Sequence, residues 1–159
     1  MKIFFNIAFS YFLIASFACD AQLQSHSFEQ IDSLQKYDSR NTVVFIYTDW
    51  CKFCHAMQTT TLENTNNIQL LNSNFWFVTL NAEEKQTINY KGHLFHFKST
   101  GNDVGTHELA EELATIDGEI SFPSLCILNQ NDEIIFQCNH FLSAEELELI
   151  LTQVLKSQE

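Results

Sequence analysis

Two cysteines separated by two residues are the side chains best suited to chemistry in this sequence. Cys51 and Cys54 follow an apolar run, Val43 to Tyr47, and precede a segment with helical character. A thiolate at the first turn of a helix is stabilised by unpaired backbone N–H groups and by the helix dipole. We therefore expect Cys51 to be the more acidic and more exposed thiol, and to act as the nucleophile.

The two-residue spacing suits a cycle of dithiol and disulfide states. Cys54 lies about one helical turn beyond Cys51 and faces inward, so its sulfur can reach a mixed disulfide formed at Cys51. Closing the internal bond releases the other thiol. This exchange needs no cofactor, and we predict none.

The apolar pattern predicts the strands that position this pair. Runs of consecutive apolar residues predict buried strands over 42–48 and 75–80, joined through the segment that holds the cysteines and therefore parallel. Two further runs, 124–128 and 134–138, predict an antiparallel hairpin. Between these parts, residues 88–105 are expected to form an inserted hairpin that turns at Lys91-Gly92 and is followed by a polar loop.

Capping signals and apolar stripes predict the helices. Ser27 with Gln30, and Ser143 with Glu146, have the spacing of capping boxes at the first and last helix. The expected helical ranges are 27–37, 54–64, 68–71, 106–116 and a final helix that follows Ser143.

The first 18 residues differ from the rest of the chain. Lys2 is followed by an apolar stretch that ends at Ala18, which predicts an export signal rather than a membrane span. Cys19 then either begins a chain cut by ordinary signal peptidase or carries lipid, because the segment also resembles a degenerate lipobox. An uncleaved anchor is the third alternative. The expected division is leader 1–18, linker 19–25 and one domain over 26–159.

The chain is strongly acidic. Its net charge is −12, and removal of the leader takes away Lys2 and no acidic residue, which gives −13. Nucleic acids and anionic lipid surfaces repel such a chain, so neither is an expected partner. A membrane contact is expected only through lipid on Cys19.

The remaining cysteines, Cys126 and Cys138, fall in the two strands of the expected hairpin. A tight turn between those strands would place Cys126 opposite Ile135 or Phe136, so a bridge to Cys138 is out of register. We expect both to be buried as small apolar side chains.

This order of parts resembles the thioredoxin fold over residues 26–156. The motifs that carry the resemblance are Trp50 to Cys54 and Phe122-Pro123-Ser124, which looks like the family's cis-proline segment. The resemblance implies an α/β fold of three layers with a central mixed sheet. It also implies that the Pro123 loop faces the cysteines, that Phe122 offers backbone hydrogen bonds to substrate, and that Trp50 shapes the rim. His107 to Ala110, ahead of the Pro123 segment, is similar to exported bacterial relatives with a hairpin insertion.

Three positions depart from the family pattern. Phe45 stands where thioredoxins place a buried Asp that moves a proton to or from the second cysteine. Lys52-Phe53 replaces the usual dipeptides, so the redox potential is not predicted from it. Lys52 favours a thiolate or is simply solvated, and His55 supports proton transfer near Cys54 or is a surface residue.

Three other classes of function stay open. Cys51 to His55 fits the Cys-x-x-Cys-His pattern of c-type haem attachment. A metal site would use the same cysteines with His55 and one of His93, His96 or His107, although His93 and His96 are expected to face opposite sides of an extended segment. The third class is a binding module without redox activity.

The prediction that follows is a thiol:disulfide oxidoreductase exported to the bacterial periplasm. Cys51 attacks and Cys54 resolves, and the substrates are protein thiols and disulfides held beside Pro123. The Trp50-Cys51 start, with no His between the cysteines, favours a reductase or isomerase over a primary oxidant. A reductase outside the cytoplasm needs electrons, which implies a membrane thiol relay as partner.

Overall fold

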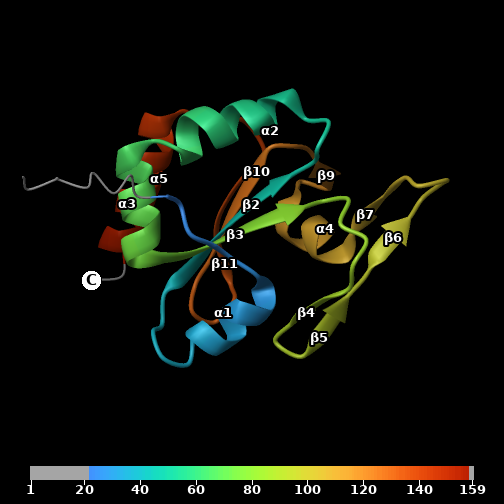
Figure 1. Cartoon of the computed structure of the whole chain (residues 1–159), viewed down its shortest axis with the longest axis horizontal. Coiled ribbons are helices and arrows are strands. Elements are labelled where there is room, and N and C mark those ends of the chain that lie inside the picture. The colour runs from blue at the N-terminus through green and yellow to red at the C-terminus, as the bar shows by residue number, and fades with distance from the viewer. Residues whose placement is uncertain (1–21, 158–159) are drawn as a thin grey trace, which may run out of the picture.

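A computed structural model describes residues 22–157, and a five-stranded sheet forms their centre (Figure 1). In spatial order its strands are β1 (Ser25–His26), β3 (Phe75–Asn81), β2 (Asn41–Tyr47), β10 (Ser124–Leu128) and β11 (Ile134–Cys138). β1, β3 and β2 are parallel, whereas β10 is antiparallel to both β2 and β11. The sheet is therefore mixed, as expected.

β2 is covered on both faces, which is why its sequence is an unbroken run rather than an alternation. Its first six residues are all buried. Side chains alternate between the faces, so Val43 and Phe45 enter one core while Val44 and Ile46 enter the other.

Two helical layers cover the sheet and confirm the three-layer architecture (Figure 1). One layer consists of α1 (Phe28–Leu34) and α4 (Glu108–Ala114). The other consists of α2 (Lys52–Met57), the π-helical segment η1 (Gln58–Leu62), α3 (Thr65–Asn74) and α5 (Ala144–Lys156). Among residues 22–157, no helix has the length and apolar character needed to cross a membrane.

Both predicted capping boxes are present. The Ser27 hydroxyl accepts a hydrogen bond from the Gln30 backbone, and the Gln30 side chain accepts one from the Ser27 N–H at 2.8 Å. Ser143 and Glu146 repeat the arrangement at the start of α5. These reciprocal bonds fix where the first and last helices begin.

Several predicted boundaries are wrong in the first half of the chain. α1 ends at Leu34 instead of reaching residue 37, and α2 gives way to a π-helix where a continuous helix was expected. α3 has ten residues where a turn or short helix over 68–71 was expected, because Asn64 caps it through its side chain. Ser25, assigned to the linker, pairs with Phe77 in β1. The predicted leader and Cys19 lie outside the described residues.

The helix expected over 106–116 is shorter at both ends. Its first two residues belong to β7 (Gly105–His107), and its last two form β8 (Thr115–Ile116), which pairs with β9 (Glu119–Ile120). The connecting residues Asp117 and Gly118 both have positive φ, 53° and 81°, as a two-residue hairpin turn requires. The β-branched pair before this turn therefore pairs as a strand instead of extending the helix.

Residues 88–105 form two hairpins where one was expected. The first, β4 (Ile88–Tyr90) with β5 (His93–Phe95), turns at Lys91-Gly92 as predicted and packs on α1. The second, β6 (Phe97–Ser99) with β7, replaces the expected polar loop and extends away from the body of the molecule (Figure 1). β6 is largely exposed, so its sequence carries no apolar alternation that would have revealed a strand.

Cys126 and Cys138 are buried and unbonded, but not for the reason predicted. A bulge at Ile135 of β11 shifts the register, so Cys126 pairs with Gln137. The expected pairing with Ile135 or Phe136 was wrong. The two thiols are separated because they face opposite sides of the sheet: Cys126 lies in the core under α1 and α4, and Cys138 in the core under α2, α3 and α5.

Candidate functional site

The cysteine pair lies where the chain passes from β2 into α2. Cys51 is the N-cap of α2, and its sulfur accepts a hydrogen bond from the backbone N–H of Cys54 at 3.1 Å. The two sulfurs are joined in a disulfide, with their Cα atoms 5.2 Å apart. Cys51 keeps 7% of its surface exposed and Cys54 keeps 1%. A thiol that approaches from solvent therefore meets Cys51 before Cys54.

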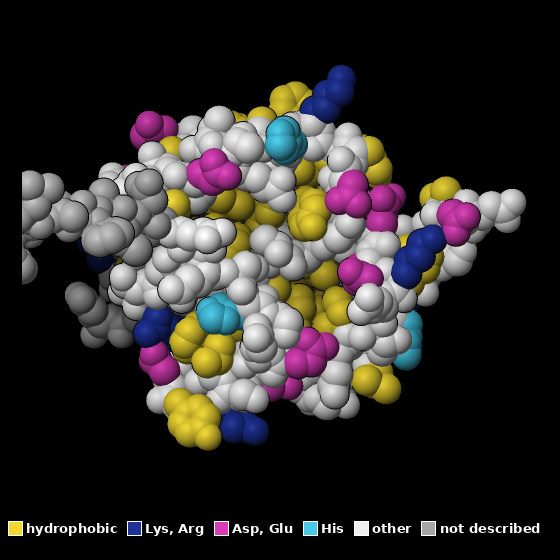
Figure 2. All heavy atoms as spheres, viewed as in Figure 1, with side chains coloured by type: hydrophobic (Ala, Val, Ile, Leu, Met, Phe, Trp, Pro, Cys, Tyr) yellow, Lys and Arg dark blue, Asp and Glu magenta, His cyan; other side chains and the backbone are white. Residues whose placement is uncertain are grey.

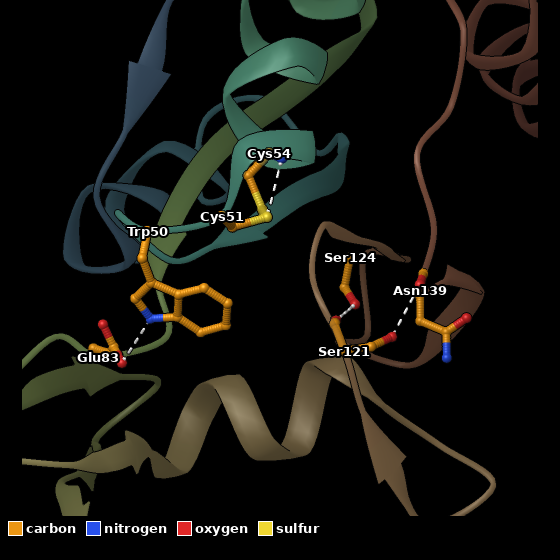
Figure 3. The surroundings of a disulfide bond; sticks show 7 residues. All are labelled: Trp50, Cys51, Cys54, Glu83, Ser121, Ser124 and Asn139. Atoms are coloured by element: carbon orange, nitrogen blue, oxygen red, sulfur yellow. Dashed lines mark hydrogen bonds between the residues drawn. A yellow bond between two sulfur atoms is a disulfide. The ribbon is translucent and has the colours of Figure 1, made fainter.

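The segment before β10 lies across from this disulfide (Figure 3). Its peptide bond between Phe122 and Pro123 is cis. Phe122 packs against both cores, including the one that contains the two cysteines. The Ser124 hydroxyl donates to the Ser121 carbonyl at 2.6 Å, and the Ser121 hydroxyl donates to the Asn139 carbonyl at 2.9 Å. These bonds hold the segment in place beside the disulfide.

Strand topology explains why two segments about 70 residues apart in sequence meet here. The carboxyl ends of β2 and β3 lie at the same edge of the sheet because the strands are parallel. The amino end of β10 lies there too, because β10 is antiparallel to β2 and Ser124 pairs with Ile46. The loops that follow β2 and β3 and precede β10 therefore converge on one edge.

Trp50 forms one border of the site through a contact that the sequence analysis missed. Its side chain is 68% exposed, and its indole N–H donates to a Glu83 carboxylate oxygen at 3.1 Å (Figure 3). The Asn81 side chain accepts from the Glu83 N–H at 2.9 Å and donates to Asp49 at 3.2 Å. Asn81 thus ties the loop after β3 to the loop after β2. The sequence did carry one signal for this contact. Glu83 comes soon after the strand that was predicted to run parallel to the strand before Trp50.

Phe45 lies on the same face of the sheet as the cysteines and has no exposed surface. Its ring stacks on Tyr47 with centroids 5.8 Å apart. Burial raises the pKa of Tyr47, and the negative charges of Asp49 and Glu84 add to that shift. Phe45 supplies no ionisable group to the core that holds Cys54, so a proton leaving that thiol needs another path.

The other predicted modulators are exposed. Lys52, Phe53 and His55 all lie on the solvent side of α2, and Phe53 is 69% exposed. Phe53 therefore adds an apolar side chain to the surface around the disulfide. The proposed effects of Lys52 and His55 on the thiols stay predictions.

The histidines considered as metal ligands do not gather around the cysteines. His93 is exposed and packs edge to face on Phe95, with ring centroids 4.5 Å apart. His96 bonds to Thr87, and His107 is buried beneath the start of α4. Over residues 22–157, no group of three or more His, Cys, Asp or Glu side chains is placed to hold a metal ion. Both sulfurs that haem attachment would use are joined to each other.

The two other described thiols are poorly suited to exchange. Burial raises the pKa of the Cys126 thiol to about 12, with a smaller contribution from the charge of Cys138 on the adjacent strand, and burial also raises the pKa of Cys138. A thiol, unlike a thiolate, is a weak nucleophile. Thiol chemistry in the described part of the chain is therefore concentrated at Cys51 and Cys54.

The fold and the cysteine pair define a class. Residues 28–155 match the family model described as a thioredoxin-like domain, and the chain belongs to that family. A comparison with curated protein sequences gave no significant match.

Solved structures show the same fold at low identity. The chain is similar to a DsbH oxidoreductase, with 17% identity, a TM-score of 0.59 and 86% of each chain covered. A thioredoxin from Thermus thermophilus gives 18% identity and a TM-score of 0.59, with 84% of this chain and 87% of that chain covered. A disulphide isomerase from Xylella fastidiosa gives 14% identity and a TM-score of 0.53, with coverage of 84% and 95%.

Proposed function

We propose that this protein is a thiol:disulfide oxidoreductase of the bacterial cell envelope that acts as a reductase or isomerase on other proteins. The observation that carries the proposal is the Cys51–Cys54 disulfide at the start of α2, in which Cys51 is the more exposed residue. It lies across from the segment between Ser121 and Ser124, which contains the cis Phe122–Pro123 bond. The DsbH oxidoreductase and the disulphide isomerase among the structural relatives support this activity.

The reaction starts from the reduced protein. The Cys51 thiolate attacks one sulfur of a substrate disulfide, and the other substrate sulfur leaves as a thiolate that takes a proton from solvent. Cys54 then loses its proton and attacks the Cys51 sulfur. The second substrate thiol leaves, and the Cys51–Cys54 disulfide forms. Two electrons pass from protein to substrate, so a dithiol partner must reduce the protein again, and a membrane thiol relay would supply it.

Insulin reduction with dithiothreitol as electron source tests the activity. We expect turnover for the wild type and its loss in Cys51→Ser and Cys54→Ser. Cys126→Ala is the matched control, since it removes a buried thiol on the opposite face of the sheet from the disulfide and should keep turnover. Wild-type turnover no faster than that of the two Ser variants would contradict the enzymatic proposal.

The direction of electron flow needs a second measurement. Equilibration of the Cys51–Cys54 pair with glutathione gives its potential, since roughly 30 mV corresponds to a tenfold shift for a two-electron couple. A potential near that of thioredoxin would support the reductase assignment. A potential near that of the strong periplasmic oxidants would contradict it.

Export is proposed from the leader sequence and has its own test. Mass spectrometry of protein purified from an envelope fraction would show whether the chain begins at Cys19, and whether that residue carries lipid. Recovery of the full-length chain in the cytoplasm would contradict export.

A further inference from the structure

Three carboxylates beside the disulfide have no cationic partner among the described residues. Asp49 follows β2, and Glu83 and Glu84 follow β3, so all three stand at the edge of the sheet where the disulfide lies. None of them takes part in an ion pair within residues 22–157, where the salt bridges involve other acidic residues. Lys85, the neighbouring cation in sequence, pairs with Asp103 of the projecting hairpin instead.

Hydrogen bonds fix these carboxylates. Asn81 donates to Asp49 at 3.2 Å, and Trp50 donates to Glu83 at 3.1 Å. Glu84 accepts from the Gln86 N–H at 2.9 Å. Each carboxylate retains oxygen lone pairs beyond these bonds, because a single donor satisfies only part of its capacity. The negative charge is therefore held in place and remains available to an incoming cation.

Apolar side chains share this surface with the carboxylates. Trp50 and Phe53 are 68% and 69% exposed, and Ile120 of β9 is 37% exposed. Figure 2 shows acidic side chains next to exposed hydrophobic ones on the face that it presents. In the loops around the disulfide (residues 49–54, 81–84 and 119–124), Lys52 is the only Lys or Arg against four acidic residues. The surface is thus both apolar and negative.

We propose that the site prefers cationic substrates: extended polypeptide segments whose disulfide-bonded cysteine is flanked by an apolar residue and by Lys or Arg. This inference rests on the oxidoreductase function proposed above and names its substrate class. The apolar flank would pack on Trp50 or Phe53. The cation would lie near the carboxylates, where Coulomb attraction speeds encounter, and over the exposed indole face, where cation–π attraction adds to it.

A pair of synthetic peptide disulfides tests the preference. Each peptide has one cysteine flanked by Leu, with two Lys in one peptide and two Glu at the same positions in the other. Reduced protein is mixed with each peptide disulfide, and the second-order rate constant is measured. This rate constant is divided by that of dithiothreitol with the same peptide, which corrects for the effect of the charges on the reactivity of the peptide disulfide itself. We expect the corrected rate to be about tenfold higher for the Lys peptide at low salt, and this ratio to shrink at high salt.

Charge-neutralising variants locate the effect. The triple variant Asp49→Asn, Glu83→Gln, Glu84→Gln should bring the ratio close to one. Gln at position 83 still accepts the indole hydrogen bond. Glu63→Gln is the matched control, because it removes one charge from an exposed residue at the far end of the same helical run, and it should keep the ratio. A ratio unchanged in the triple variant would overturn the assignment to these carboxylates.

An uncharged substrate separates this inference from the function on which it rests. If the wild type reduces hydroxyethyl disulfide and both peptides no faster than the Cys51→Ser variant does, the oxidoreductase proposal fails. If it reduces all three but shows equal corrected rates for the Lys and Glu peptides, or a faster rate for the Glu peptide, the oxidoreductase proposal survives and the cationic preference is overturned.

Discussion

At the scale of single residues, Phe45 sets the environment of the resolving cysteine. It fills with an aromatic ring a position on the sheet that faces the same core as Cys54. Burial in apolar surroundings disfavours a thiolate, so the resolving thiol of the reduced protein is expected to be less acidic than Cys51. The deprotonation of Cys54 would then have to rely on solvent or on the departing substrate thiolate.

A carboxyl group introduced at this position tests how apolar the core is. We expect Phe45→Asp to lower the free energy of unfolding by about 4 kcal/mol near neutral pH, because it removes a buried ring and leaves an unpaired charge. Burial would raise the pKa of the new Asp above its unfolded value. The folded state would then bind more protons, and the destabilisation should shrink as the pH falls. Urea unfolding at several pH values measures this.

Phe45→Leu is the control for the charge. It keeps the position apolar, so we expect a smaller loss that does not change with pH as the Asp variant does. A loss for Phe45→Asp that is independent of pH would show that the new carboxyl reaches solvent and that this core is open.

Residue types alone revealed only part of the site. The spacing of the cysteines and the single proline identified the disulfide and the cis-proline segment, because each depends on local sequence. Glu83 and Asn81 were not found, because their roles depend on the pairing of β3 beside β2. An exposed Glu next to another Glu has no distinguishing local pattern. Only the topology makes these residues neighbours of Trp50.

At the scale of elements, the projecting β6–β7 hairpin depends on Gly105. A Cβ at this position would lie 2.1 Å from the Lys98 carbonyl oxygen and 2.6 Å from the Phe97 ring. We expect Gly105→Ala to cost about 1–3 kcal/mol because the neighbouring strand must move. Hydrogen exchange should show faster exchange in residues 97–107. Gly101→Ala is the matched control, because its Cβ would meet no atom within 4 Å, and it should leave exchange unchanged.

The junction between β7 and α4 contains a buried histidine that should respond to pH. His107 has no exposed surface, and its Nδ1 accepts a hydrogen bond from the Leu109 N–H at 3.2 Å. Burial lowers the pKa of His107, while Glu84 and Glu108 oppose that shift. Below pH 6.5 the unfolded chain therefore takes up the proton first, and stability falls as the pH drops toward the folded-state pKa.

Replacing this histidine should flatten the pH dependence. We expect the wild type to lose more unfolding free energy than His107→Gln between about pH 7.5 and about pH 5.5, by at most about 1.4 kcal/mol per pH unit. Urea unfolding at both values gives the comparison. Equal pH slopes for the two proteins would mean that His107 is protonated equally in the folded and unfolded states.

Element boundaries were less predictable than element types. The strands at β2 and β3 follow from unbroken apolar runs, and the capping boxes fix the starts of α1 and α5. By contrast, the bulge that shifts β10 against β11 has no marker in residues 134–138. The Thr115–Ile116 pair joins a strand only because β9 is available as its partner. Such boundaries depend on contacts between segments, which a local pattern does not contain.

At the scale of the whole molecule, the excess of negative charge should matter for stability. The chain carries −12, and four of the seven Lys and Arg residues within 22–157 take part in ion pairs. Repulsion among the remaining carboxylates destabilises the compact state, and salt screens it. We expect the melting temperature to rise by about 2–4 °C between about 10 mM and about 300 mM NaCl. Calorimetry measures this, and a lower melting temperature in salt would indicate that ion pairs outweigh repulsion.

The position of Cys126 and Cys138 on opposite faces of the sheet gives the molecule two built-in reporters of local opening. Each thiol is buried beneath one helical layer, so we expect it to react with a reagent from solvent when that layer separates from the sheet. A brief pulse of an alkylating reagent, followed by peptide mapping, would therefore distinguish the two layers without any added probe. Early labelling of Cys138 would mean that the layer of α2, α3 and α5 opens first, and early labelling of Cys126 would mean that the layer of α1 and α4 does.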